Sequence, residues 1–162
     1  MSRSAGLIVD GLIFLAVLLP IVTSDITRHR IPDRYIASGV LLILLRRLLF
    51  SHPLSVGLLL DAVTGFSIGF TFIFLIWIVT RKKIGLGDAK LSGLMGLLLG
   101  LPGWVLALLL ASVSGAAYGI SGILRGTMTR RDRIPFAPFL GIGALAGWTF
   151  NLLGEEVIHG LI

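Results

Sequence analysis

RKKIGLGDAKLSGLMGLLLG, from Arg81 to Gly100, carries the residues Gly-Leu-Gly-Asp at positions 85–88, where a hydrophobic helix is expected to begin. Asp is a favoured helix N-cap and glycine suits the turn before a helix, so these residues alone predict a helix start. A carboxylate at the edge of a bilayer, however, is costly unless it is paired, solvated or used. The rest of the chain decides between a capping and a functional role for Asp88.

The composition predicts a membrane protein. Of the 162 residues, 56% are hydrophobic and only 14% are charged, and the mean hydropathy is +0.99. There is too little polar surface to face water on all sides, so lipid must cover most of the chain. We expect an all-α, polytopic membrane protein whose single integral-membrane domain spans residues 1–162.

The same composition narrows the chemistry. The chain has no cysteine, which excludes disulfides, thiolate catalysis and cysteine-based zinc sites. Its three histidines lie in separate segments, so we expect neither a metal site nor another cofactor. A net charge of +6 could suggest nucleic acid in a soluble protein, but here the basic residues flank apolar segments, and we expect no nucleic-acid partner.

Six segments are long and apolar enough to be candidate membrane spans, since a crossing needs roughly 20 residues. Their approximate limits are Ala5–Thr23, Tyr35–Phe50, Leu54–Thr80, Asp88–Leu101, Gly103–Leu124 and Pro138–Leu153. The fourth is short and glycine-rich, and only Leu101-Pro102-Gly103 separates it from the fifth. The sequence therefore predicts six transmembrane helices with both termini on one side.

The positive-inside rule orients these spans. Eleven of the 14 Lys and Arg residues lie in, or just beside, the loops after the first, third and fifth spans. Cytoplasmic loops carry the excess of basic residues. We therefore expect a multi-pass protein of the plasma (inner) membrane, with cytoplasmic basic loops and external termini.

Two aspartates then fall at the same depth. Asp25 ends the first span and Asp88 begins the fourth, both on the predicted cytoplasmic side. Two neighbouring carboxyl groups cannot both ionise cheaply, so one keeps a proton. The ionised group can take a proton from water while the protonated one polarises a carbonyl, without metal or cofactor. Gly85 and Gly87 would let the backbone turn sharply and approach a substrate strand.

Four stretches together resemble the type IV prepilin peptidase family, a group of GxGD-type membrane aspartic proteases. They are SDITRHRIPD (24–33), LDAVTGFSIGF (60–70), GLGDAKL (85–91) and RIPFAPFLGIGALAG (133–147). The resemblance implies that Asp25 and Asp88 are the catalytic pair of an endopeptidase. It implies that this enzyme removes the leader of a prepilin or pseudopilin at the cytoplasmic membrane face.

The resemblance also implies that Pro135, Phe136 and Pro138 lie near the active site and shape it. Bifunctional members carry an extra N-terminal segment and cytoplasmic domain, and also N-methylate the new N-terminus. This chain begins at the first core span and has no cysteine, as in short, peptidase-only members. We therefore expect peptidase activity without N-methyltransferase activity.

The remaining charged residues have plainer interpretations. Lys90 either orients a carboxylate or contacts lipid headgroups, and Asp33 orders its loop or caps the second span. Asp61 is expected to form a buried pair with Arg46 or Arg47, or a helix-packing hydrogen bond. Asp10 is expected to be solvated near the outer interface.

A small ion- or proton-coupled transporter is the alternative function. A transporter needs acids near the membrane midplane and often has an inverted repeat, whereas the two chief acids here sit at one face and no repeat is evident. Membrane lipid is an expected partner, and the oligomeric state is open.

Overall fold

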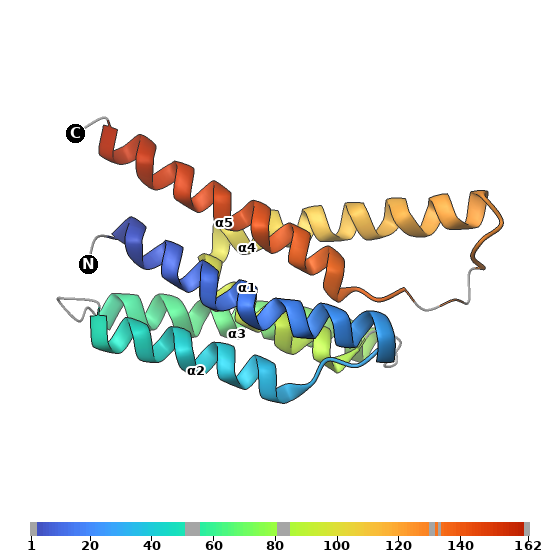
Figure 1. Cartoon of the computed structure of the whole chain (residues 1–162), viewed down its shortest axis with the longest axis horizontal. Coiled ribbons are helices and arrows are strands. Elements are labelled where there is room, and N and C mark those ends of the chain that lie inside the picture. The colour runs from blue at the N-terminus through green and yellow to red at the C-terminus, as the bar shows by residue number, and fades with distance from the viewer. Residues whose placement is uncertain (1–2, 51–55, 81–84, 130–131, 133, 161–162) are drawn as a thin grey trace.

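The computed structural model describes residues 3–50, 56–80, 85–129, 132 and 134–160. Within these ranges the chain forms five helices and no strand, as expected for an all-α protein (Figure 1). The helices are α1 (Arg3–Arg28), α2 (Asp33–Phe50), α3 (Val56–Val79), α4 (Leu86–Leu124) and α5 (Ala137–Gly160).

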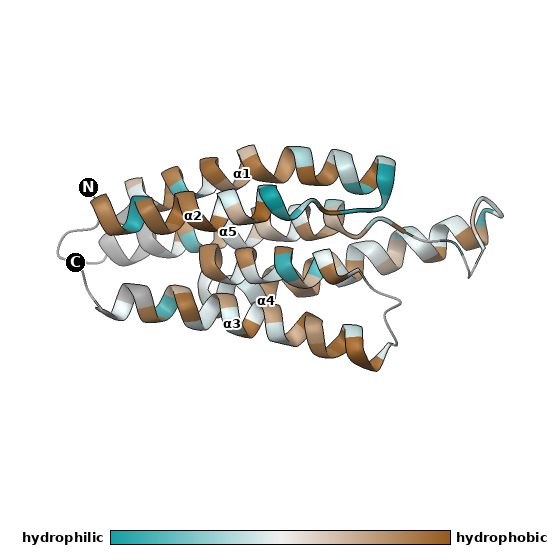
Figure 2. Ribbon diagram, turned by 90° about the horizontal axis from the view of Figure 1, so that it is seen from below, coloured by the Kyte–Doolittle hydropathy of each residue, from teal (hydrophilic) through white to brown (hydrophobic). Residues whose placement is uncertain are grey.

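Four of these helices are long and apolar enough to cross a membrane. They comprise residues Ala5–Arg28, Leu60–Val79, Leu86–Leu124 and Ala137–Gly154. α2 is shorter and carries Asp33, Arg34, Arg46 and Arg47. Figure 2 shows hydrophobic colouring along the helices and strongly hydrophilic colouring where α1 passes into α2. A membrane protein built from apolar helices is therefore supported, whereas six separate helices are not.

The difference from six helices lies in α4, where the predicted fourth and fifth spans form one element of 39 residues with a break. At Gly100 the backbone leaves the helical region, with φ 65° and ψ −178°. Trp104 Nε1 nevertheless donates a hydrogen bond of 2.9 Å to Ser92 Oγ. Twelve residues of straight helix would separate these positions by about 18 Å, so the chain turns back on itself and α4 has two arms (Figure 1).

The break exposes two carbonyl groups, and side chains from other helices satisfy them. Pro102 has no N–H, so the Leu98 carbonyl lacks its helical donor; Arg47 Nη2 lies 3.5 Å from it. The Leu99 carbonyl accepts a hydrogen bond of 2.8 Å from Asn151 Nδ2 of α5. The turn in α4 is thus held from both sides, because unsatisfied backbone groups are costly in an apolar interior.

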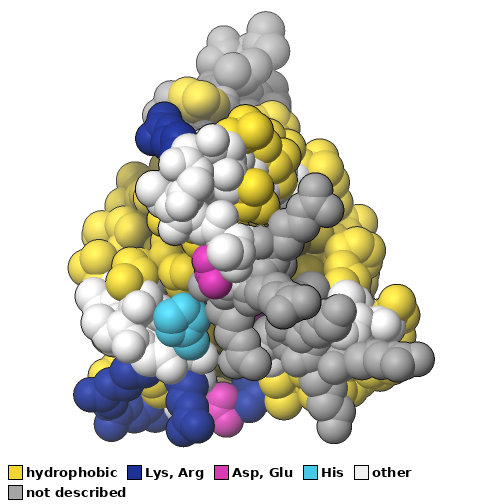
Figure 3. Space-filling model, turned by 90° about the vertical axis from the view of Figure 1, so that its right-hand side faces the viewer, with side chains coloured by type: hydrophobic (Ala, Val, Ile, Leu, Met, Phe, Trp, Pro, Cys, Tyr) yellow, Lys and Arg dark blue, Asp and Glu magenta, His cyan; other side chains and the backbone are white. Residues whose placement is uncertain are grey.

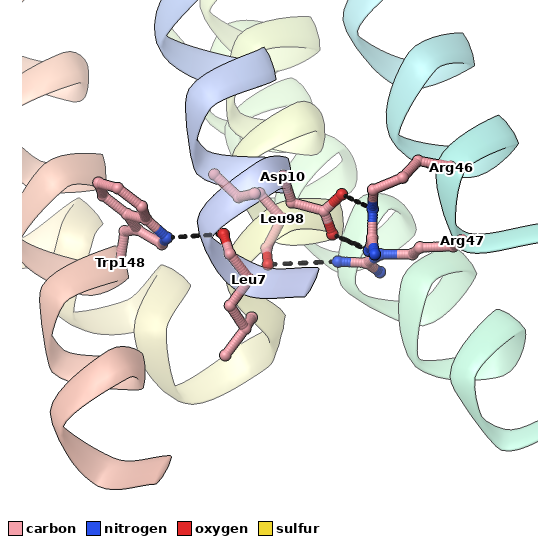
Figure 4. A network of polar contacts seen from close by, with 6 residues as sticks. All are labelled: Leu7, Asp10, Arg46, Arg47, Leu98 and Trp148. Carbon is pink, nitrogen blue, oxygen red and sulfur yellow. Dashed lines mark hydrogen bonds and ion pairs between the residues drawn. The ribbon is translucent and has the colours of Figure 1, made fainter. Parts of the chain in front are cut away.

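A buried ion cluster adjoins this break (Figure 4). Asp10 of α1 is 1% exposed and pairs with both arginines of α2. Arg46 donates to both carboxylate oxygens, with Nη2 at 2.6 Å from Oδ2, and Arg47 Nε lies 3.0 Å from Oδ2. The expectation of a solvated Asp10 is therefore wrong. Asp61 is exposed, and the arginines assigned to it are taken by Asp10.

Small residues bring α3 and the first arm of α4 into close contact. A side chain at Gly65 would clash with the Gly96 carbonyl, and one at Gly96 would clash with the Gly65 carbonyl. Ser92 Oγ also donates to the Gly69 carbonyl at 2.9 Å. This agrees with the close helix packing that GxxxG spacing favours in membranes.

The helix ends and the connecting loops lie at the two opposite ends of the bundle. The start of α1 and the end of α5 lie at one end of the bundle, and the α1–α2 loop and the start of α4 lie at the other (Figure 1). Six basic residues used to orient the spans fall outside the described residues: Arg81, Lys82, Lys83, Arg130, Arg131 and Arg133.

Candidate active site

The end of α1 fixes the first aspartate. α1 ends at Arg28, and the next residue, His29, has the left-handed φ of 49°. Its N–H donates to the Asp25 carbonyl at 2.9 Å, which is the hydrogen bond of a left-handed helix cap. Ser24 Oγ donates to the Arg30 carbonyl at 2.8 Å and folds the loop back. Asp25 is therefore held in the last turn of an ordered helix end.

The carboxyl group of Asp25 points to the start of α5. It is only 7% exposed, and Oδ2 accepts a hydrogen bond of 3.0 Å from the backbone N–H of Ala137. Ala137 is the first residue of α5 and is fully buried. The N-terminal end of a helix carries partial positive charge, so it both orients and stabilises a carboxylate.

Asp88 lies at the start of α4, but it is not the N-cap. The helix begins at Leu86, and the extended residue Gly85 (φ −71°, ψ 136°) is the N-cap. Asp88 is the third helical residue, and its Oδ2 accepts a hydrogen bond of 3.2 Å from the Gly85 N–H. The side chain is 8% exposed. Asp88 thus stabilises the helix start through one of its carboxylate oxygens. This contact does not prevent the carboxyl group from having a second role.

Gly87 allows the α1–α2 loop to approach α4. A Cβ atom at Gly87 would lie 2.7 Å from Ile31 Cβ, which is too close for any side chain. Within the described residues, the glycines with positive φ are Gly100 and Gly126, so Gly87 is not required by a left-handed turn. Its small size lets the α1–α2 loop pack against the first turn of α4, whereas the sequence had suggested a sharp turn or contact with substrate.

Asp25 and Asp88 meet at one cavity although they are 63 positions apart in the sequence. The cavity has a volume of about 270 Å³, and both aspartates line it. Its lining residues are Asp25, His29, Arg30, Ile31, Gly85, Leu86, Gly87 and Asp88. Figure 3 views this end of the molecule and shows Lys and Arg side chains along its lower edge, with a further basic patch at the upper left.

The other predicted site residues lie nearby but outside the cavity. Lys90 Nζ is 2.7 Å from both carboxylate oxygens of Asp33, so it orients a carboxylate, but not one of the two in the cavity. Pro135, Phe136 and Pro138 are half-buried, and none is among the described residues that line the cavity. Their segment reaches the site through the backbone of Ala137, which lies between them.

Sequence reasoning missed five contributions, one of which is Leu86, a lining residue between the two predicted glycines. His29, Arg30 and Ile31 also line the cavity, and the Ala137 amide binds Asp25. Proximity to Asp25 was the only signal for the three loop residues, and a backbone amide leaves no signal because every non-proline residue has one. Among the residues whose side chains are described, no group of three or more His, Cys, Asp or Glu could hold a metal ion.

These features define a class: an all-α protein with membrane-length apolar helices and two buried carboxyl groups at one cavity. In sequence, residues 12–120 match the family model of the type IV leader peptidase family. The chain therefore belongs to the type IV leader peptidase family.

Individual relatives agree with the family match. A prepilin leader peptidase/N-methyltransferase of Bacillus subtilis (strain 168) is 29% identical over 91% of this chain and 57% of its own length. A protein with that name from Aeromonas hydrophila is 33% identical over 91% of this chain and 50% of its own length. One from Aeromonas salmonicida (strain A449) is 37% identical over 60% of this chain and 34% of its own length. The matches thus cover between about a third and somewhat more than half of the length of these relatives. No solved structure matches it.

Proposed function

We propose that this chain is a membrane aspartic endopeptidase that removes the leader peptides of prepilin-like proteins, with Asp25 and Asp88 as its catalytic pair. The observation that carries the proposal is the meeting of these two buried acids at one cavity, in a chain of the type IV leader peptidase family. The relatives named above are prepilin leader peptidases, which makes a prepilin or pseudopilin the proposed substrate.

The chemistry follows from two carboxyl groups that share one proton. The ionised group removes a proton from water as the water oxygen attacks the carbonyl carbon of the scissile peptide bond. The protonated group donates to the carbonyl oxygen, giving a neutral tetrahedral intermediate. When the C–N bond breaks, the group that took the proton from water gives it to the amine nitrogen. The other group, now ionised, removes a hydroxyl proton from the intermediate as the carbonyl re-forms, so the pair returns to its starting state. The Ala137 amide holds one oxygen of Asp25 in place throughout.

The membrane arrangement is part of the proposal. The two arms of α4 would each cross the bilayer, which with α1, α2, α3 and α5 gives six crossings within one integral-membrane domain of residues 1–162. The termini would face outward and the cavity would open at the cytoplasmic face, as the distribution of basic residues suggests. Lipid would surround the bundle. We do not propose N-methyltransferase activity for this chain.

Both acids lie at helix ends on one side of the bundle, and a transporter would need them near its middle. This position favours hydrolysis at a membrane face over ion transport through the protein.

The experiment is co-expression with a candidate prepilin, scored by leader removal. Asp25→Asn and Asp88→Asn should each lower the rate of leader cleavage by about 10³-fold or more, because Asn is nearly isosteric but cannot transfer the proton. Since the two groups act as one unit, the double variant should be no worse than either single variant. Asp61→Asn, at an exposed acid of α3, is the matched control and should cleave normally. Substantial cleavage by either Asn variant would remove that residue from the proposed pair.

A further inference from the structure

The connection between α1 and α2 folds back onto the end of α1. The His29 N–H donates to the Asp25 carbonyl at 2.9 Å, and Ser24 Oγ donates to the Arg30 carbonyl at 2.8 Å. These two hydrogen bonds join the connection to the last turns of the helix that carries Asp25. The position of the connection and the position of Asp25 are therefore coupled.

The same connection contacts α4 at two points. Ile31 packs against Gly87, where a Cβ atom would lie 2.7 Å from Ile31 Cβ. At the first residue of α2, both carboxylate oxygens of Asp33 lie 2.7 Å from Lys90 Nζ. Lys90 is only about 3 Å along the helix axis from Asp88. The ion pair therefore attaches the connection to the part of α4 that carries the second acid.

Direct packing cannot set the separation of the two acids as closely, because α1 and α4 make little contact with each other. Among the described residues, α2 packs against both helices and lies between them. At Gly39 of α2, a Cβ atom would lie 3.3 Å from Val17 of α1 and 3.1 Å from Leu94 of α4. The separation of Asp25 and Asp88 thus depends on how α2 and the connection before it are seated on α4.

We propose that the Asp33–Lys90 ion pair is a positioning contact of the active site, which holds the α1–α2 connection on α4 and so sets the separation of Asp25 and Asp88. This assignment rests on the proposed function and extends it, because it names two residues that act on the reaction through the catalytic pair. The Asp33 and Lys90 side chains are 70% and 31% exposed. An ion pair this exposed stabilises a fold only slightly, so variants without it should stay folded and lose alignment a few-fold.

The first arm of the test measures leader removal from a candidate prepilin in membranes. Lys90→Met and Asp33→Asn should each lower kcat about threefold to fivefold and change KM less than about twofold. Since both substitutions break one contact, the double variant should be no worse than either single variant. Lys90→Arg keeps the charge and should retain most of the activity. Arg34→Met, which removes an exposed cation next to Asp33 and outside the cavity lining, is the matched control and should leave kcat unchanged.

A second arm measures the separation without substrate. The chain has no cysteine, so Asp25→Cys combined with Asp88→Cys places the only two thiols at the cavity. Adding Lys90→Met should slow their crosslinking by a short bifunctional thiol reagent about threefold to fivefold, whereas adding Arg34→Met should not. A purely electrostatic effect of Lys90 on substrate or lipid would leave this rate unchanged.

The two arms separate the positioning assignment from the proposed function. If the unmodified chain removes the leader but Lys90→Met keeps its kcat, or the losses of the two single variants add in the double variant, the assignment is wrong and the proposed function stands. A crosslinking rate unchanged by Lys90→Met would overturn the assignment as well. If the unmodified chain removes no leader, the proposed function fails, and the crosslinking rate alone decides whether the ion pair sets the separation.

Discussion

Replacing Asp10 by Asn should destabilise the bundle far more than its distance from the cavity suggests. Asp10 is the carboxylate that pairs with both Arg46 and Arg47, and the side chains of Asp10 and Arg47 are 1% and 8% exposed. Asn keeps the shape but leaves the guanidinium groups of buried Arg47 and partly buried Arg46 without a counter-charge. Breaking a buried ion pair by removing one partner costs about 3–5 kcal/mol.

Thermal unfolding in detergent micelles is the assay. For a protein of this size, about 3–5 kcal/mol corresponds to a fall in the unfolding midpoint of at least roughly 6 °C. Asp61→Asn is the control, since it removes an exposed acid and should change stability by less than about 0.5 kcal/mol.

A triple variant separates charge imbalance from lost packing. Asp10→Leu combined with Arg46→Leu and Arg47→Leu removes all the charges, and apolar replacement of a whole buried ion cluster is often neutral. Recovery should stop short of the parent, because the Leu98 carbonyl loses the Arg47 donor. A midpoint shift below about 2 °C for Asp10→Asn, or a triple variant less stable than the single one, would refute this reasoning.

Two further predictions concern the site and its orientation. Gly87→Ala should reduce leader removal, because its new methyl group meets the Cβ atom of Ile31. A double variant with Ile31→Gly, which lacks that atom, should regain much of the activity, whereas a double variant no better than the single one would show that packing is not the cause. Because the chain has no cysteine, Thr127→Cys and Gly154→Cys can each place a single thiol at one end of the bundle. An impermeant thiol reagent added to intact cells should label position 154 but not position 127. The reverse labelling pattern would show that the proposed topology is inverted.

The sequence predicted the general site better than its details. Charge distribution and span order predicted that Asp25 and Asp88 lie at the same depth, and the structure brings them to one cavity; their catalytic role stays a prediction. Sequence order could not identify the partner of Arg46 and Arg47, since Asp10 and Asp61 are both acids in neighbouring helices and only side-chain direction distinguishes them. Six separate helices are not supported, because the predicted fourth and fifth spans lie in one helical element in which the chain reverses at Gly100.

The turn in α4 has a consequence for the thickness of the membrane around the protein. The arm that carries Asp88 runs from residue 86 to residue 99, and its 14 residues rise only about 21 Å. The hydrocarbon layer of a typical bilayer is about 30 Å thick. If this arm crosses alone, the lipid beside it must thin or the cavity must sit below the level of the surrounding headgroups. Asp88 would then lie at a local depression of the bilayer surface. Water and an extended peptide could reach its carboxyl group there, although the neighbouring helices α1 and α3 are long enough to cross the full hydrocarbon layer.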